Sequence, residues 1–188
     1  MNDPQQNQPE VGDLLVQEGR ISPQQLDQVR RRQQRMDVPQ HRAIVDLNFA
    51  SEEVTWRTLA RLNQLDFIDV ASVDLNKEIL ESVPLKVIFH YRLLPVGKED
   101  DVLVLAFSEP PRQIEQGNLR LLLGKRFKVV LATPSAIHSV IKKSFGLGAE
   151  TVQRLREERG GGEITQEIVF DVQGKEGDSA LEATVSAF

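Results

Sequence analysis

The stretch Leu15–Ser22 (LVQEGRIS) returns further along the chain as Ile44–Ser51 (IVDLNFAS), and this repeat decides the fold. In each copy two aliphatic residues are followed by a turn residue, Gly19 or Asn48, and then by a serine. Glycine and asparagine readily adopt the left-handed backbone that ends a helix, and serine caps the start of the next one. Each copy therefore predicts a short helix, a tight break and a longer helix.

Local signals set the ends of these helices. Ser22 and Gln25 have the spacing of a capping box, and Pro23 suits the first helical position. In the second copy, acidic residues follow Ser51 and place negative charge at the positive end of the helix dipole. Pro39 stops the longer helix of the first copy, because proline cannot continue it. Together these signals predict an N-terminal bundle of four helices, formed by two helical hairpin repeats.

After residue 65 the pattern changes to short apolar runs that alternate with helical periods. The change begins at 67–70; we expect strands at 92–96, 102–107 and 127–131, and helices at 77–82, 84–90, 110–123 and 134–145. The polar turn at 97–101 between two apolar runs predicts an antiparallel hairpin. The fold class expected for the whole chain is α+β, with a small α/β subdomain whose short sheet is largely antiparallel.

The expected organisation has four parts: a disordered N-terminus at 1–9, a helical tandem-repeat subdomain at 10–65, an α+β subdomain at 66–146, and a flexible linker at 147–188. The last part is charged and rich in glycine, with a short extended piece expected at 168–172.

Composition excludes several classes of protein. No apolar run has the roughly 18 to 20 residues that a membrane-spanning helix needs. The polar N-terminus lacks the features of a secretory signal, and the chain has no cysteine, so we expect a cytoplasmic protein without disulfides. The net charge of -5 argues against a nucleic acid polymer as partner.

No catalytic constellation emerges from the sequence. A P-loop needs glycines at fixed spacing followed by Lys and Ser or Thr, and the nearest run, from Gly117 to Arg126, has the wrong spacing and no hydroxyl. His41, His90 and His138 lie far apart without further ligands nearby, so we expect surface or half-buried histidines rather than a zinc site. The chain is expected not to be an enzyme and to hold no metal.

The two copies resemble the tandem motif of the MshEN domain, the N-terminal domain of type II secretion and type IV pilus assembly ATPases. Copy one runs from Glu10 to Gln33, and copy two begins at Pro39 after a five-residue spacer of the family's length. The motif positions kept are Val11, Gly12, Leu15, Val16, Gly19, Ile21, Leu26, Gln33, Ile44, Val45, Phe49 and Leu59. The resemblance covers roughly residues 10 to 150.

The resemblance implies a regulatory or docking domain that acts by protein–protein interaction at the cytoplasmic face of the inner membrane. Its expected partners are the cytoplasmic domain of an inner-membrane platform protein and an ATPase core, either in the same chain or in trans. We expect the sequence to be a fragment of a longer ATPase. A standalone adaptor and a receptor for cyclic di-GMP remain alternatives.

Some members of this family bind cyclic di-GMP with the two motif copies. The residues that would form such a site here are Glu10, Val11, Gly12, Leu15, Val16, Gly19, Arg20, Gln33, Gln40, His41, Arg42, Ile44, Val45 and Glu109. Several depart from the family: Glu10 stands where an arginine is usual, Pro39-Gln40-His41 replaces Arg-Leu-Gly, and Glu109 replaces an aspartate. Arg20 and Arg42 are the cations available to compensate. Because core packing explains the retained aliphatic residues equally well, we expect a weakened or absent ligand site.

Overall fold

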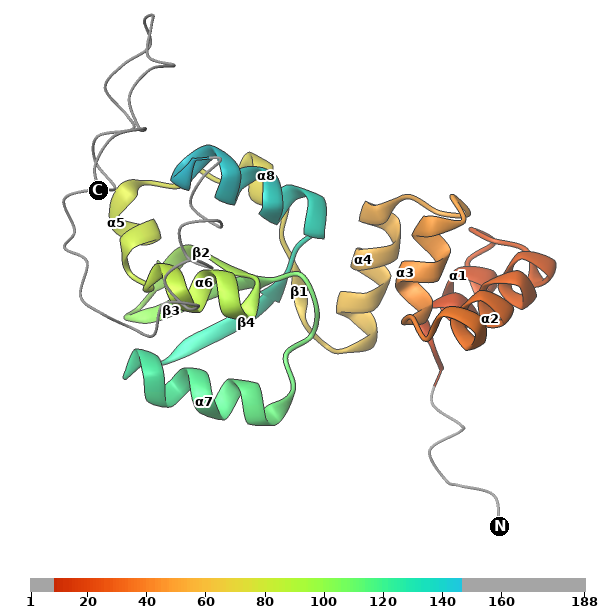
Figure 1. The fold of residues 1–188 in the computed structure, drawn as a ribbon, viewed down its shortest axis with the longest axis horizontal. Helices are drawn as coiled ribbons and strands as arrows, with labels where there is room; N and C mark the ends of the chain where they lie inside the picture. Colours follow the sequence, from red (N-terminus) through yellow and green to blue (C-terminus); the bar gives the residue numbers. More distant parts are fainter. Residues whose placement is uncertain (1–8, 147–188) are drawn as a thin grey trace, which may run out of the picture. The chain divides into compact units, whose positions relative to one another are not determined.

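The computed structural model describes residues 9–146. The expected disordered N-terminus, the flexible linker and its extended piece at 168–172 lie outside this range, apart from residue 9. The first helices are α1 (Val11–Gln17), α2 (Pro23–Met36), α3 (Gln40–Asp46) and α4 (Glu52–Leu62). The elements that follow are β1 (Asp66–Phe67), η2 (Val70–Ser72), α5 (Lys77–Glu81), α6 (Leu85–Tyr91), β2 (Leu93–Glu99), β3 (Val102–Phe107), α7 (Gln113–Leu123), β4 (Phe127–Leu131) and α8 (Pro134–Phe145) (Figure 1).

The helix breaks lie where the repeat places them. Gly19 and Asn48 both have a left-handed backbone, with φ of 65° and 55°. The predicted capping box is present, since the Gln25 amide donates to Ser22 Oγ at 3.2 Å and the Ser22 amide donates to Gln25 Oε1 at 2.7 Å. The predicted breaks after α1 and α3 and the predicted start of α2 are therefore confirmed.

The sheet has the strand order β1-β4-β3-β2. The β2–β3 hairpin is antiparallel as predicted, but β4 is parallel to both β1 and β3. The expectation of a largely antiparallel sheet is therefore wrong, and the sheet is mixed. The reason is the crossover helix α7 between β3 and β4, because such a helix returns the chain to the start of a parallel neighbour.

Several predicted boundaries differ from the observed ones, and β2 continues to Glu99, through part of the turn expected at 97–101. The segment 67–70, where the sequence pattern changes, contains the end of β1 and the start of the 3₁₀ helix η2 at Val70, because the Asp69 side chain accepts the Ala71 amide and turns the backbone. The helix expected from residue 110 begins at Gln113, with a capping box between Arg112 and Glu115. Arg92 has a φ of 48° and ends α6, so β2 begins one residue later than expected.

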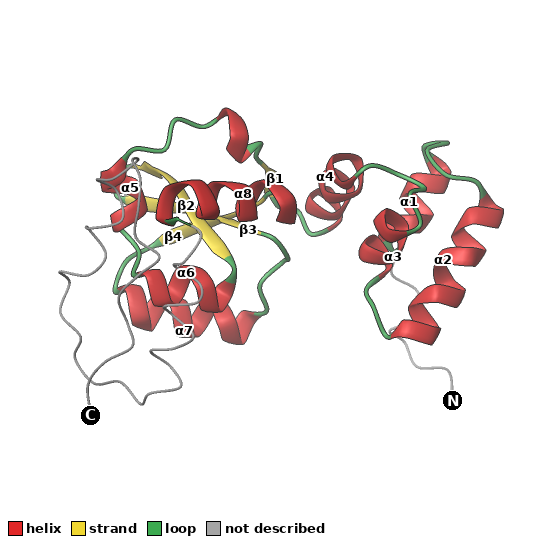
Figure 2. Cartoon of the chain, turned by 45° about the horizontal axis from the view of Figure 1, so that its top comes forward, coloured by secondary structure: helices red, strands yellow, loops and turns green. Residues whose placement is uncertain are grey.

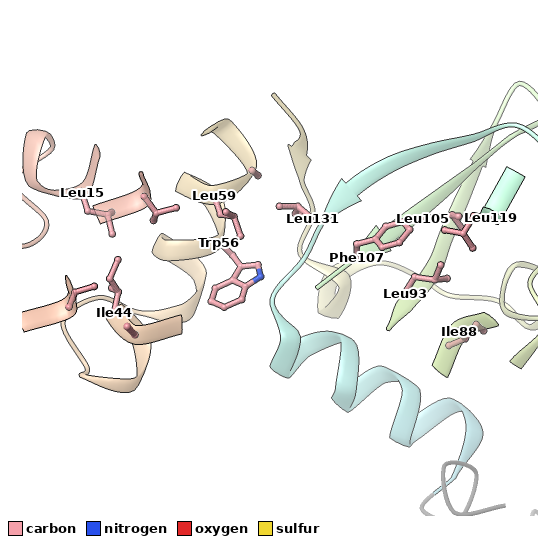
Figure 3. Packing of buried hydrophobic residues seen from close by; sticks show 14 of the residues in the cluster. Leu15, Ile44, Trp56, Leu59, Ile88, Leu93, Leu105, Phe107, Leu119 and Leu131 are labelled. Carbon is pink, nitrogen blue, oxygen red and sulfur yellow. The ribbon is translucent and has the colours of Figure 1, made fainter. Parts of the chain in front are cut away.

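Helices lie on both faces of the sheet (Figure 2), and an apolar cluster packs against each face. On one face, Ile137 of α8 packs with strand residues such as Leu94 and Val104. On the other face, Ile88 of α6 and Leu119 of α7 are fully buried, and the same cluster continues into α1–α4 (Figure 3). No helix within residues 9–146 is long and apolar enough to cross a membrane.

Candidate functional site

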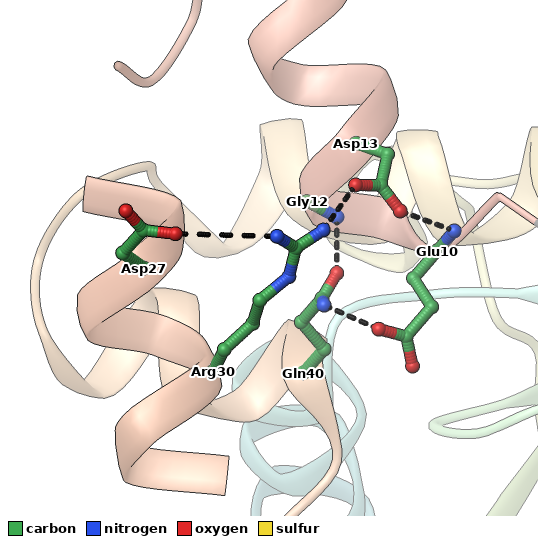
Figure 4. A network of polar contacts seen from close by, with 6 residues as sticks. All are labelled: Glu10, Gly12, Asp13, Asp27, Arg30 and Gln40. Atoms are coloured by element: carbon green, nitrogen blue, oxygen red, sulfur yellow. Dashed lines mark hydrogen bonds and ion pairs between the residues drawn. The ribbon is translucent and has the colours of Figure 1, made fainter. Parts of the chain in front are cut away.

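Three of the predicted site residues form one polar cluster at the start of the two repeats. The Gly12 amide donates to Gln40 Oε1 at 2.5 Å, and Gln40 Nε2 donates to Glu10 Oε2 at 2.5 Å (Figure 4). Gln40 is buried at only 4% exposure, so this amide links α1 to α3 inside the protein. We call Glu10, Gly12 and Gln40 the Gln40 cluster. Glu10, which stands where the family usually has an arginine, here accepts a hydrogen bond from Gln40 of its own chain.

Gly12 is required for this arrangement. A Cβ placed on it would lie 2.4 Å from Leu26 Cδ1 and 2.6 Å from Gln40 Oε1. Such distances are far inside normal van der Waals contact, so no larger residue fits without moving α2 or Gln40. Because Gly12 has no side chain, Gln40 of the same protein can approach its backbone closely.

Charged side chains flank the Gln40 cluster on the outside. Asp13 accepts from Arg30 Nη2 at 2.8 Å, and its other oxygen accepts the Glu10 amide at 3.0 Å (Figure 4). Arg30 also lies 4.0 Å from Asp27 on the same helix. Arg30 therefore carries its own carboxylate partners.

A second cluster joins His41, Arg42 and Glu109, and we call it the Glu109 cluster. The two carboxylate oxygens of Glu109 divide between these partners: Oε2 lies 2.7 Å from His41 Nε2, and Oε1 accepts from Arg42 Nε at 2.9 Å. Burial raises the pKa of Glu109, but the hydrogen bonds and charges of His41 and Arg42 outweigh it and hold the pKa below its ordinary value. Arg42, one of the two cations expected to compensate for lost arginines, is thus neutralised within the protein.

The Glu109 cluster rests on a tryptophan that the sequence did not single out. The His41 ring meets the Trp56 ring edge-on, with centroids 5.1 Å apart. The Trp56 indole donates to the Ser108 carbonyl at 2.6 Å, next to Glu109 in the chain. His41 is buried, so the expectation of surface or half-buried histidines is wrong for this residue, whereas His90 and His138 are exposed. The sequence signal that could have identified Trp56 is that it is the single tryptophan of the chain and lies on an amphipathic helix.

The remaining predicted site residues divide by burial. Val11, Leu15 and Ile44 are core residues, with Leu15 and Ile44 fully buried, and Val16 and Val45 pack against the same core while half-buried. Gly19 and Arg20 are exposed in the turn after α1, and Gln33 is half-buried on α2. No hydrogen bond between described residues joins these three positions to the Gln40 or Glu109 clusters.

Comparisons with known proteins relate the chain to domains of pilus and secretion ATPases. The MshEN domain model matches residues 63–151. The type IV pilus assembly ATPase PilB of Myxococcus xanthus (strain DK1622) is 25% identical over 135 residues, which are 72% of this chain and 24% of the relative. The chain thus spans about a quarter of the length of that relative.

Solved structures of MshE and of the N-terminal domain of XpsE are also similar to this chain. MshE, solved with cdg (cyclic di-GMP), is 26% identical at a TM-score of 0.62, covering 72% of this chain and 98% of that one. The N-terminal domain of XpsE shares the fold at a TM-score of 0.55 and 20% identity, covering 71% of this chain and 92% of that one. Residues 63–151 thus match the MshEN domain, and the chain is similar to the pilus assembly ATPase PilB and to MshE and shares its fold with the N-terminal domain of XpsE.

Proposed function

We propose that the chain is a non-catalytic regulatory and docking domain of a type II secretion or type IV pilus ATPase. It acts by binding the cytoplasmic domain of an inner-membrane platform protein, and it is held at the cytoplasmic face of that membrane through this partner. The family relationship and the relationship to a pilus ATPase support this role. The ATPase core to which the domain belongs supplies the chemistry.

The observation that carries the docking proposal is the exposed apolar face of α7. Ile114, Leu121 and Leu122 are 66%, 84% and 61% exposed. Ile114 and Leu121 are seven residues apart and lie on one side of the helix, with Gly117 between them. Large aliphatic side chains gathered on one helix face typically mark a protein contact, and a glycine between them lets a second backbone approach closely.

Binding of the 188-residue chain to the purified platform cytoplasmic domain tests this proposal. We expect saturable binding that Leu121→Asp weakens by about tenfold or more, since a buried aliphatic contact is replaced by a desolvated charge. Gln113→Asp is the matched control, because it adds the same charge to an exposed position of α7 that lies away from the face of Ile114 and Leu121 and removes no apolar group. Absence of binding, or equal effects of the two substitutions, contradicts docking through α7.

A second candidate function is that of a cyclic di-GMP receptor. The similarity to MshE, which was solved with cyclic di-GMP, favours it. Against it stand the internal pairs of this chain: a ligand that used the Gly12 amide would displace Gln40, and one that used Arg42 would compete with Glu109. Each displacement leaves a partly buried polar group without its partner.

Calorimetric titration with cyclic di-GMP distinguishes the two functions. We expect no saturable heat from the natural chain, and a gain of binding in Glu10→Arg, which restores the charge usual in the family. Saturable binding of the natural chain that Arg42→Ala abolishes would establish the receptor function instead.

A further inference from the structure

A cleft of about 420 Å³ lies at the carboxyl ends of the parallel strands β3 and β4. Ser108 follows the end of β3, Pro134 begins the helix after β4, and both line the cleft. In open α/β sheets, ligands bind in the crevice outside the carboxyl ends of the strands. The volume is within the range of sites for small molecules. Its position and size are therefore those of a ligand site.

The charged side chains that line the cleft are all basic. Arg42 comes from α3, Arg92 from the end of α6, and His138 and Lys142 from one face of α8. Only Arg42 has a carboxylate partner, Glu109; within residues 9–146 no carboxylate pairs with Arg92, His138 or Lys142. Basic groups gathered around one cleft repel each other and create a positive potential, which a bound anion relieves.

Arg92 lies where α6 ends. Its φ of 48° lies in the left-handed region that Gly19 and Asn48 occupy after α1 and α3. The conformation ends α6 at Arg92, as left-handed residues commonly end helices. The Arg92 side chain is exposed and lines the cleft.

Part of the cleft wall is aromatic and aliphatic. Phe89 and Ile141 both line the cleft and are half-buried. Ile141 packs against the apolar clusters, whereas Phe89 belongs to neither cluster of the described residues. A phenyl ring that the core does not use is available to stack on a planar group of a ligand.

We propose that this cleft binds a nucleoside phosphate. The phosphate is bound by Arg92, His138 and Lys142, and the base stacks on Phe89. Among the predicted cyclic di-GMP residues only Arg42 lines the cleft, so this site is distinct from the Gln40 cluster. Since the lining comes from α3, α6 and α8, a bound ligand would join the helical repeats to the sheet subdomain.

Titration of the ¹⁵N-labelled 188-residue chain with AMP, monitored by NMR, tests the site directly. We expect saturable shifts of amides at 88–92 and 135–142, with weaker binding of inorganic phosphate, which lacks the base, and of adenosine, which lacks the phosphate. Arg92→Gln and Lys142→Gln should each weaken AMP binding by about tenfold, as loss of a charge-assisted hydrogen bond does. Lys143→Gln, an exposed neighbour that does not line the cleft, should leave the affinity unchanged.

Three outcomes overturn the proposal: no AMP shifts up to high ligand concentration, shifts confined to residues 10–45, or equal affinity for AMP and inorganic phosphate. The NMR map of the natural chain decides between these outcomes and the expected one even if a variant loses stability. Because the titration uses neither the platform protein nor cyclic di-GMP, its failure leaves the docking proposal standing.

Discussion

The indole of Trp56 on α4 donates a 2.6 Å hydrogen bond to the carbonyl of Ser108, the residue after β3. Trp56 is 2% exposed and lies where the apolar cluster passes from the repeat helices to the sheet (Figure 3). Its ring also packs against His41, which contacts Glu109. Trp56 thus links the packing of the repeat helices to the Glu109 cluster, whose residues are among the predicted ligand-site residues.

Replacing Trp56 by Phe tests this link. Phenylalanine retains an aromatic ring but removes the donor, so the buried Ser108 carbonyl loses its partner. We expect a loss of about 1–3 kcal/mol in the free energy of unfolding, measured by urea denaturation with circular dichroism. Arg31→Gln, at an exposed position of α2, should change stability by less than about 0.5 kcal/mol. A Trp56→Phe variant as stable as the natural chain would refute the structural role.

Two glycine-to-alanine substitutions should have effects of opposite sign. Gly12→Ala places a methyl group against Leu26 and Gln40 and should destabilise the chain by about 1–3 kcal/mol. Gly117→Ala, in α7 with open space around the new methyl group, should stabilise it by about 0.5–1 kcal/mol. Thermal or urea unfolding of both variants measures the difference. Equal changes in the free energy of unfolding of the two variants would show that the Gln40 cluster is not closely packed.

Glu109 should contribute stability that depends on pH. Its folded pKa lies below its unfolded value, so the folded state binds fewer protons and the contribution is fully present above the unfolded pKa. It is lost as the pH falls through the folded pKa. We expect the stability gap between the natural chain and Glu109→Gln to be largest near neutral pH and to shrink in acid. Urea midpoints at pH 7 and pH 3 measure it, and a gap that widens in acid would contradict the assignment.

The capping box at the start of α2 gives a further prediction. Ser22→Ala removes the acceptor for the Gln25 amide and should reduce stability by about 1 kcal/mol. Ser139→Ala, at an exposed position inside α8, is the comparison, because alanine is the better helix former there. If both substitutions have the same effect, the capping interaction does not contribute.

The repeat helices were predictable because their signals are local. A left-handed turn residue, a capping serine and a proline act within one turn of the backbone, and Gly19, Ser22 and Pro23 all behave as the sequence indicates. The parallel pairing of β4 was missed because it depends on which strands meet across α7, a relation between residues such as Leu105 and Val129 that no local pattern encodes.

The candidate site was only partly predictable for the same reason. The motif identified Glu10, Gln40, Arg42 and Glu109, but the sequence does not say that these residues pair with one another. Those pairs join positions far apart in the chain and depend on how α1 and the end of β3 lie against α3. Arg92, His138 and Lys142 carried no sequence signal, because only the fold brings them to one cleft.

The central claim is that this domain works through a protein partner rather than a dinucleotide. The most direct test is the affinity of the 188-residue chain for the platform cytoplasmic domain, measured by calorimetry with and without a large excess of cyclic di-GMP. The account predicts saturable binding whose affinity is the same in both conditions. Binding that appears only with cyclic di-GMP, or no binding in either condition, would contradict it.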